Sequence, residues 1–327
     1  MKKEKVFFRK QTIIGDWDLE KFGIWDLFVP KSRIQTVDNG AYGSGGVYSK
    51  FTVIHGKLGE LFVKTGKHHG GTYFSNNEPI AEHIASDIGS ELGFDVAPYI
   101  LAIVDMNLFL SEEQEFIDVT DVPKGLSFNK SLRMAGKVLA SVSQSFLDAG
   151  EQLYSCRALH GNDLEGPDLH EDICKAHDFM GRKAIDQMIM FDYIVHNTDR
   201  HHQNFGFIKD QDGLVRPAPL YDHSLSLLAE HPIEAIREDE MDVCGYVRGK
   251  PFGSLLGALG LVHLHSAAGL EISKDSQLFF DKIDSFQGVL ENERIEIMKQ
   301  VVKRGITHVE KVLYTLQRHH NRDFFRT

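Results

Sequence analysis

Cysteine is scarce in this 327-residue chain, and its three copies lie far apart. Cys156, Cys174 and Cys244 form no C-x-x-C pair and no even set that would predict a disulfide framework. Free thiols in a reducing compartment are the simplest interpretation. The sequence also lacks an uninterrupted apolar run of membrane-spanning length, and its charged first residues lead into no apolar core of signal-peptide length. We therefore expect a cytoplasmic protein without a membrane span.

Basic residues are fewer than acidic residues in this sequence. The 36 Lys and Arg residues face 47 Asp and Glu residues, which gives a formal net charge of -11. A general nucleic-acid binder needs an excess of basic residues to neutralise phosphates, so we expect no direct binding to nucleic acid. Internal repeats and low-complexity tracts are also absent. A hydrophobic content of 42% is typical of a globular protein with a proper core.

The most informative stretch follows an apolar run that ends at Ile194-Val195. Asp199 comes shortly after this run, and Asn204 stands five positions later. The D-x4-N spacing is that of a phosphotransferase catalytic loop, where Asp handles the acceptor hydroxyl and Asn holds a metal ion. A second apolar segment then ends at Asp222, which we predict to be the main magnesium ligand.

A glycine-rich segment near residue 40 is a candidate for binding the nucleotide. Its central residues are Gly43, Ser44, Gly45 and Gly46. Glycines let backbone N–H groups approach phosphate oxygens without a Cβ in the way. The pattern is not a G-x4-G-K-[ST] P-loop, and a turn with no ligand is the commoner outcome for such a stretch. A predicted hairpin follows, with strands over 50–55 and 60–64.

Lys64 ends the second strand of this hairpin, where a kinase places the lysine that grips the α- and β-phosphates. A solvated strand end is the ordinary alternative. The segment 79–92 has apolar residues at helical spacing and carries Glu82. If Glu82 pairs with Lys64, it holds the ammonium toward the nucleotide. Otherwise it is a solvated helical acid.

The remaining pattern predicts an α+β protein of two lobes: a small antiparallel sheet with one key helix, and a larger, mostly helical part. We expect an N-terminal extension over 1–35, an N-lobe over 36–117, a C-lobe over 118–327, and a hinge near 112–118. Further predicted elements are a strand over 96–107, helices over about 127–150, 173–195 and 291–318, and a hairpin over 205–216 with an Asp-Gly turn. The irregular segment 230–253 is either a substrate loop or an ordinary surface loop.

Histidines crowd the catalytic stretch and raise a rival hypothesis. His196, His201, His202 and His223 accompany two aspartates, and this ligand set suits the transition metal of a metal-dependent phosphoesterase. That hypothesis leaves the glycine-rich loop, Lys64 and Glu82 unexplained. We interpret His201 as a ring that braces the catalytic loop through hydrogen bonds to the backbone or to Asp222.

These motifs resemble the HipA-like protein kinases, including the shorter CtkA-type members that lack an extra N-terminal subdomain. The resemblance covers residues 39–229 and is carried by N-T-D-R-H-x-x-N-F-G over 197–206, A-P-x-Y-D over 218–222, Val63-Lys64, and Glu82 placed eleven residues before Gly93. The 197–206 motif is specific, whereas the glycine-rich segment matches only loosely.

The resemblance implies a two-lobed kinase fold and ATP- and Mg²⁺-dependent phosphorylation of serine or threonine in a protein acceptor. It implies Asp199 as catalytic base with Arg200 and His201 in support, and Asn204 and Asp222 as metal ligands. Lys64 and Glu82 would anchor the nucleotide. In HipA-type toxins a serine of the glycine-rich loop is autophosphorylated, and Ser44 is the corresponding residue here. The family holds both toxins with an antitoxin partner and stand-alone kinases, so an antitoxin-type partner is one of two outcomes.

Two alternatives stay open from the sequence. The motif Asp199-Arg200-His201-x-x-Asn204 also resembles that of phosphatidylinositol 3- and 4-kinases. On this alternative the acceptor would be a lipid or another small molecule. A non-catalytic pseudokinase would bind nucleotide without transferring phosphate. The second alternative is disfavoured because every catalytic position is filled.

Overall fold

The computed structural model describes residues 6–9, 13–38, 48–69, 73–109, 127–238, 248–272 and 275–324. The chain forms two compact units. Unit 1 comprises residues 1–84, 98–145 and 281–295, and unit 2 comprises residues 85–97, 146–280 and 296–327. The predicted α+β class is confirmed. The glycine-rich residues Gly43 to Gly46 and the hinge predicted near 112–118 lie outside the described residues.

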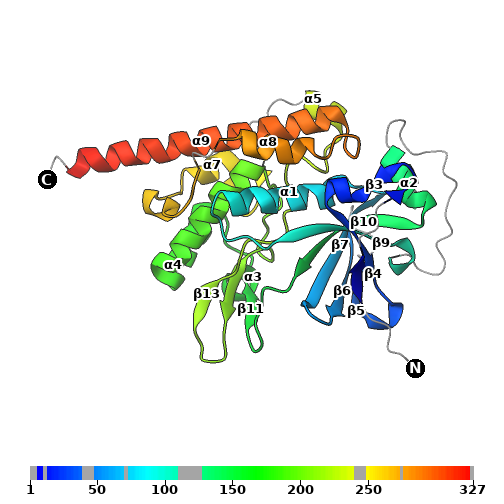
Figure 1. The fold of residues 1–327 in the computed structure, drawn as a ribbon. Coiled ribbons are helices and arrows are strands. Elements are labelled where there is room, and N and C mark those ends of the chain that lie inside the picture. Colours follow the sequence, from blue (N-terminus) through cyan, green and yellow to red (C-terminus); the bar gives the residue numbers. More distant parts are fainter. Residues whose placement is uncertain are drawn as a thin grey trace. The chain divides into compact units, whose positions relative to one another are not determined.

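Unit 1 is built on an eight-stranded sheet (Figure 1). The order across it is β1-β4-β9-β10-β7-β6-β5, and β8 pairs with β7. Neighbouring strands are antiparallel, except that β4 and β9 run parallel. The bounds are β1 (Phe7–Arg9), β4 (Ile24–Phe28), β5 (Ile34–Asp38), β6 (Tyr48–His55), β7 (Gly59–His69), β8 (Tyr73–Phe74), β9 (Tyr99–Asp105) and β10 (Lys137–Gln144). Two very short strands, β2 (Ile13–Ile14) and β3 (Trp17–Asp18), pair separately.

The hairpin of β6 and β7 confirms the strands predicted around the turn at 56–59. Gly59 has a φ of +72°, a backbone conformation that favours glycine. The Nδ1 atom of His55 accepts hydrogen bonds from the backbone N–H groups of Lys57 and Leu58 at 3.2 and 3.1 Å. Inward-facing Phe51, Val53, Leu61 and Val63 from the two strands join the buried core of this unit.

The segment expected as an N-terminal extension contributes strands to the sheet. β1 pairs with β4, and β4 pairs with β9 from the middle of the chain. Asp26 on β4 is fully buried, and its carboxylate contacts Arg9 at 2.9 Å and Lys137 at 3.2 Å. Lys137 starts β10, whose residues we expected as part of a helix in the larger lobe and which lies in the sheet of unit 1.

The helix predicted over 127–150 is wrong. A short helix, α2 (Ser127–Met134), ends before Gly136, which has a φ of +64°. Residues 137–144 then form the central strand β10, whose residues Val138 to Ser143 are all buried. A strand that is covered on both faces has apolar residues without the alternation of a half-buried strand. The periodicity of the sequence therefore does not distinguish it from a buried helix.

Helix α1 (Asn77–Glu91) confirms the predicted helix around 79–92. Ile80, Ile84, Ile88 and Leu92 recur at helical spacing, and none of them exposes more than 1% of its surface. The chain leaves the helix through Gly93, which has a φ of +84°. Short 3-10 turns complete unit 1: η1 (Leu19–Phe22), η2 (Lys31–Arg33) and η3 (Met106–Leu108).

Unit 2 is mostly helical, with a narrow ribbon of the strands β11, β12 and β13 (Figure 1). The hairpin of β12 and β13 was predicted, and its turn contains Gly213 with a φ of +85°. The bounds are β11 (Gln152–Ser155), α3 (Cys156–His160), α4 (Gly166–Val195), β12 (Gly206–Lys209), β13 (Val215–Pro217), α5 (Ile233–Glu238), β14 (Arg248–Gly249), β15 (Gly253–Ser254), α7 (Leu255–Leu259) and η5 (Leu264–Ala267). Two further helices, α8 (Gln277–Asp284) and α9 (Asn292–Phe324), have residues in both units, because 281–295 belong to unit 1.

Two glycines allow close packing around the segment that follows α4. A Cβ at Gly305 on α9 would lie 2.5 Å from the Cα of Ile194, so the two helices touch backbone to backbone near the end of α4. A Cβ at Gly206 would overlap the carbonyl oxygen of Tyr154 on β11. Larger residues at either position would therefore displace the elements that hold residues 196–205.

Candidate functional site

The candidate catalytic loop begins where helix α4 stops. His196 adopts the left-handed conformation, with a φ of +55° and a ψ of +49°, and its N–H bonds to the carbonyls of Asp192 and Tyr193. The N–H of Asn197 bonds to the Asp192 carbonyl at 2.8 Å. These bonds satisfy the last carbonyls of the helix and turn the chain sharply away from its axis. The backbone at the start of residues 197–204 is therefore held in place by the end of α4.

Arg200 is fully buried and holds this loop together. Its Nε donates to Asp192 Oδ2 at 2.9 Å, and its Nη2 donates to Asp192 Oδ1 at 2.8 Å. Its Nη1 donates to the backbone carbonyls of Asn204, at 2.9 Å, and of Tyr221. A planar guanidinium with five donors can serve all these acceptors at once. One side chain therefore joins the segment that carries Asn204 to the segment that carries Asp222.

The environment of Arg200 keeps it charged. Burial by itself lowers the pKa of a guanidinium, but the carboxylate of Asp192 and its hydrogen bonds raise the pKa of Arg200 above the ordinary value, with Asp222 adding in the same direction. Arg200 Nη2 also donates to His223 Nδ1 at 3.1 Å, so that nitrogen carries no proton. The His223 Nε2–H then donates to the Leu220 carbonyl at 3.1 Å. His223 is thus a neutral ring that braces the loop.

Asn204 and Asp199 lie at the two ends of the same turn. Asn204 Nδ2 donates to the Asp199 carbonyl at 3.2 Å, which leaves the amide oxygen as the atom suited to a metal ion. The Asp199 N–H is bonded to Asn197 Oδ1 at 3.2 Å. About a third of the Asp199 side chain is exposed. It therefore combines a fixed backbone with a carboxylate that an acceptor hydroxyl can reach.

Asp222 follows a short segment anchored at both sides. The Leu220 N–H bonds to the Asp95 carbonyl, and the Ala97 N–H bonds to the Leu220 carbonyl, both at 2.8 Å. Asp222 has a φ of +58°, which is uncommon outside glycine and is best tolerated by Asn and Asp. Ser224 Oγ donates to Asp222 Oδ1 at 3.3 Å. The fixed, partly buried carboxylate is suited to holding a hard cation.

Lys64 and Glu82 belong to unit 1, and Ser141 contacts both residues. Lys64 on β7 stands opposite Ser141 on β10 in the register of the sheet. The Ser141 hydroxyl donates to Glu82 Oε2 at 2.5 Å, and it also lies 3.4 Å from the Lys64 carbonyl. Glu82 is 1% exposed. The Glu82 carboxylate of α1 and the backbone of Lys64 thus meet at Ser141, a residue that the sequence did not single out.

We predict that Ser141→Ala lowers the free energy of unfolding by about 1–3 kcal/mol, because a buried carboxylate loses a donor. Urea titration of both proteins measures the change. Ser143→Ala, two residues along the same strand, is the matched control and should cost clearly less. Equal losses at the two positions would contradict a specific role for the Ser141–Glu82 bond.

Two further residues of the site were missed by the sequence reasoning. Asp192 is an acid within the apolar last turns of α4, and its position eight residues before Arg200 was the available signal. Lys250 lies in the irregular segment 230–253, and its Nζ is 3.5 Å from Asp199 Oδ1. The backbones of Asp199 and Lys250 also form an isolated parallel bridge. The end of this segment therefore reaches the catalytic loop.

The histidines of the candidate catalytic loop do not form a metal cluster within the described residues. His201 Nδ1 accepts the Gln203 N–H at 3.2 Å, and its Nε2 is 4.0 Å from Asp199 Oδ2. His202 Nε2 donates to the Leu164 carbonyl at 3.0 Å. Across the part of the chain that the structure describes, converging metal-type ligands occur instead at His170, Asp186 and His263. The phosphoesterase hypothesis therefore lacks its predicted ligand set there.

Comparison with solved structures assigns this architecture to the kinase-like folds. The structure is similar to the proinflammatory kinase CtkA of Helicobacter pylori, with a TM-score of 0.55 at 13% identity over 81% of this chain and 93% of that chain. This similarity confirms the predicted fold class, and at such low identity it leaves the activity to be argued from the site residues.

Weaker similarities were found to two other structures. The hydra Fam20 structure with sugar aligns with a TM-score of 0.48 at 12% identity, over 89% of this chain and 87% of that chain. HipA of Shewanella oneidensis MR-1, in a complex with HipB and operator DNA, aligns with a TM-score of 0.39 at 14% identity, over 82% and 67%. No protein-family model matches the sequence, and neither does any curated protein. Among the described residues, no helix is long and apolar enough to cross a bilayer.

Proposed function

We propose that this protein is an ATP- and Mg²⁺-dependent serine/threonine protein kinase of the HipA-like type. The observation that carries the proposal is the bonding of Arg200 to the backbone of both Asn204 and Tyr221. This bonding fixes, within one unit, the two segments on which a kinase carries its metal ligands. The kinase-like fold supports the proposal independently.

The proposed roles follow from the atoms that each residue offers. Asn204 Oδ1 and the Asp222 carboxylate would hold Mg²⁺, which prefers oxygen ligands and retains several waters. When bound, the ion would neutralise charge on the phosphates. The partly exposed Asp199 would accept or orient the proton of the acceptor hydroxyl. Lys64, with Glu82, is proposed to anchor the nucleotide, and Ser44 is proposed as an autophosphorylation site.

The acceptor is proposed to be a protein, and its class can be tested separately. The chain is incubated with γ-labelled ATP in a cell lysate, and the products are divided into protein, organic-phase lipid and small-molecule fractions. Label on serine or threonine in the protein fraction is expected. Label confined to the organic phase would instead assign a lipid acceptor. An antitoxin-type partner stays a prediction from the sequence resemblance.

We predict that MgATP raises the melting temperature of the full chain in a concentration-dependent manner. A ligand that binds only the folded state stabilises it by about 2.7 kcal/mol at 100 times its Kd. Differential scanning fluorimetry with and without Mg²⁺ measures the shift. AMP with Mg²⁺ is the control, because it lacks the β- and γ-phosphates. No shift at millimolar MgATP would count directly against a nucleotide site.

A further inference from the structure

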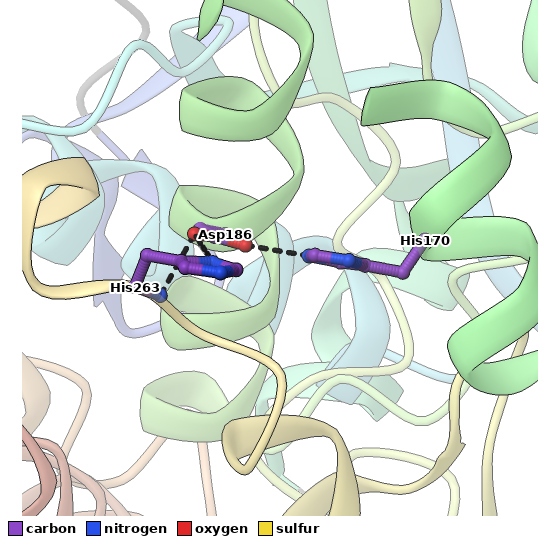
Figure 2. A group of neighbouring side chains, drawn as sticks. All are labelled: His170, Asp186 and His263. Atoms are coloured by element: carbon purple, nitrogen blue, oxygen red, sulfur yellow. Dashed lines mark hydrogen bonds and ion pairs between the residues drawn. The ribbon is translucent and has the colours of Figure 1, made fainter. Parts of the chain in front are cut away.

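A second cluster of metal-type ligands lies in unit 2, apart from the residues proposed to act on ATP. His170 and Asp186 come from α4, and His263 comes from the segment that follows α7 (Figure 2). His170 Nε2 is 2.7 Å from Asp186 Oδ1, and His263 Nδ1 is 3.2 Å from Asp186 Oδ2. The three ligand atoms all lie within 4.8 Å of one another.

The cluster exists because α4 bends sharply. A straight helix would separate residues 170 and 186 by about 24 Å along its axis, whereas their side chains touch. Figure 2 shows them on two separate stretches of helix. The bend lies near Gly181, where an added Cβ would stand 2.5 Å from His177 Cβ and 3.1 Å from the Ile173 carbonyl. In a regular helix, Cβ atoms four residues apart are about 5–6 Å apart.

The Asp186 carboxylate is held rigidly at the centre of the cluster. It is fully buried, and its Oδ2 accepts hydrogen bonds from the His263 N–H at 2.9 Å and from Ser266 Oγ at 2.7 Å. Within the described residues, its ion-pair partners are only the two histidines; neither Lys nor Arg pairs with it. A buried carboxylate without a permanent cation is an environment that a metal ion would stabilise.

The two histidines have the positions expected of metal ligands. His170 is 7% exposed, and its other ring nitrogen, Nδ1, lies 3.8 Å from Cys174 Sγ. The buried Cys174 thiol therefore stands beside the ring nitrogen that does not face Asp186, in the position of an outer partner of the ring. His263 is 47% exposed, so solvent and an incoming ion can reach the cluster from its side.

We propose that His170 Nε2, Asp186 and His263 Nδ1 form a binding site for a divalent transition-metal ion such as Zn²⁺. Two imidazoles and one carboxylate favour such an ion over Mg²⁺ or Ca²⁺, which select oxygen ligands. Atoms that share a Zn²⁺ ion at about 2.0–2.2 Å from it lie up to about 4 Å apart, so the side chains need to move little. Each imidazole would bind the ion through the lone pair of the coordinating nitrogen, and the proton of the neutral ring would stand on the other nitrogen, Nδ1 of His170 and Nε2 of His263.

The bound ion would connect three parts of the chain: both stretches of α4 and the segment leading into η5. The second stretch of α4 ends where the proposed catalytic loop begins. The ion would therefore restrain the helix from which that loop starts. The site is independent of the proposed nucleotide site, and its test uses neither ATP nor an acceptor.

The test is equilibrium dialysis of the full chain against Zn²⁺ in the presence of excess Mg²⁺. Wild type should bind about one equivalent, and His263→Ala should weaken binding by at least the roughly 10–100-fold that even an outer partner contributes. His263 is the residue of choice because it is exposed, whereas replacing the buried Asp186 could prevent folding. Co²⁺ loaded in place of Zn²⁺ should give visible absorption bands in wild type that are lost in His263→Ala.

His265→Ala is the matched control, because His265 is an exposed histidine on the same segment and lies outside the cluster. It should bind Zn²⁺ as wild type does. The proposal is overturned if wild type binds no Zn²⁺, or if His263→Ala binds it as tightly as His265→Ala. In either case the three residues form only a hydrogen-bonded cluster that fastens the η5 segment to α4.

Discussion

Asp222→Asn should reduce Mg²⁺-dependent phosphoryl transfer by at least about 10²–10³-fold, the cost typical of losing one group that stabilises charge in the transition state. Asparagine has the same shape, tolerates the left-handed backbone at φ +58°, and can still accept the hydrogen bond from Ser224 Oγ. The substitution therefore removes the charge of a metal ligand while keeping the fold. An alanine at this position would mix the loss of charge with backbone strain.

The measurement is the initial rate of label transfer from γ-labelled ATP over a range of Mg²⁺ concentrations. Asp210→Asn is the matched control, since this aspartate accepts a hydrogen bond from the Leu214 N–H at 2.8 Å in the β12–β13 turn, outside the proposed metal ligands. It should transfer at the wild-type rate. A folded Asp222→Asn protein with wild-type activity would remove Asp222 from the metal site.

Arg200→Met should lower the free energy of unfolding by about 3–5 kcal/mol. The substitution leaves the Asp192 carboxylate buried without its cation, and it takes a donor from two backbone carbonyls. Urea unfolding measures the loss. Because the same guanidinium joins the segments of Asn204 and Asp222, the surviving folded protein should also bind MgATP more weakly.

Arg216→Met is the control for this prediction. Arg216 pairs with Glu151 at 2.9 Å, but 40% of its side chain is exposed, so its loss should cost only about 0–1 kcal/mol. In a double-mutant cycle, Asp192→Leu with Arg200→Met should be less destabilising than the sum of the two single changes, because the pair is removed together. Strict additivity would show that the two side chains do not depend on each other.

Local sequence patterns correctly predicted those elements whose pattern fits only a strand or only a helix. Alternating residues and a glycine turn predicted the β6–β7 hairpin, and isoleucines at helical spacing predicted α1. The same reasoning failed at 137–144, because a strand buried on both faces has no alternation to detect. The bend in α4 also went unseen, since the continuous helical pattern through Gly181 gives no sign of it.

In the candidate site, too, the sequence predicted some residues and missed others. The spacing of Asp199 and Asn204 and the later Asp222 predicted the loop segments, because a short motif carries its own chemistry. The partners that hold the loop come from other parts of the chain, namely Asp192 on α4 and Lys250 near β14. The acid in the last turns of α4 was a local signal for Asp192, whereas no local pattern predicts the contact of Lys250, because only the tertiary fold brings it to Asp199. The same reason hid the cluster of His170, Asp186 and His263, whose members are up to 93 residues apart in the sequence.

The most direct measurement compares α- and γ-labelled ATP with wild type and with Asp199→Asn, each added to the same cell lysate with Mg²⁺. If the protein is a kinase that uses Asp199 as its base, wild type transfers only the γ-label to an acceptor, and Asp199→Asn is slower by about 10²–10⁴-fold. Transfer that is absent from wild type, or unchanged in the folded variant, would contradict phosphoryl transfer at this loop.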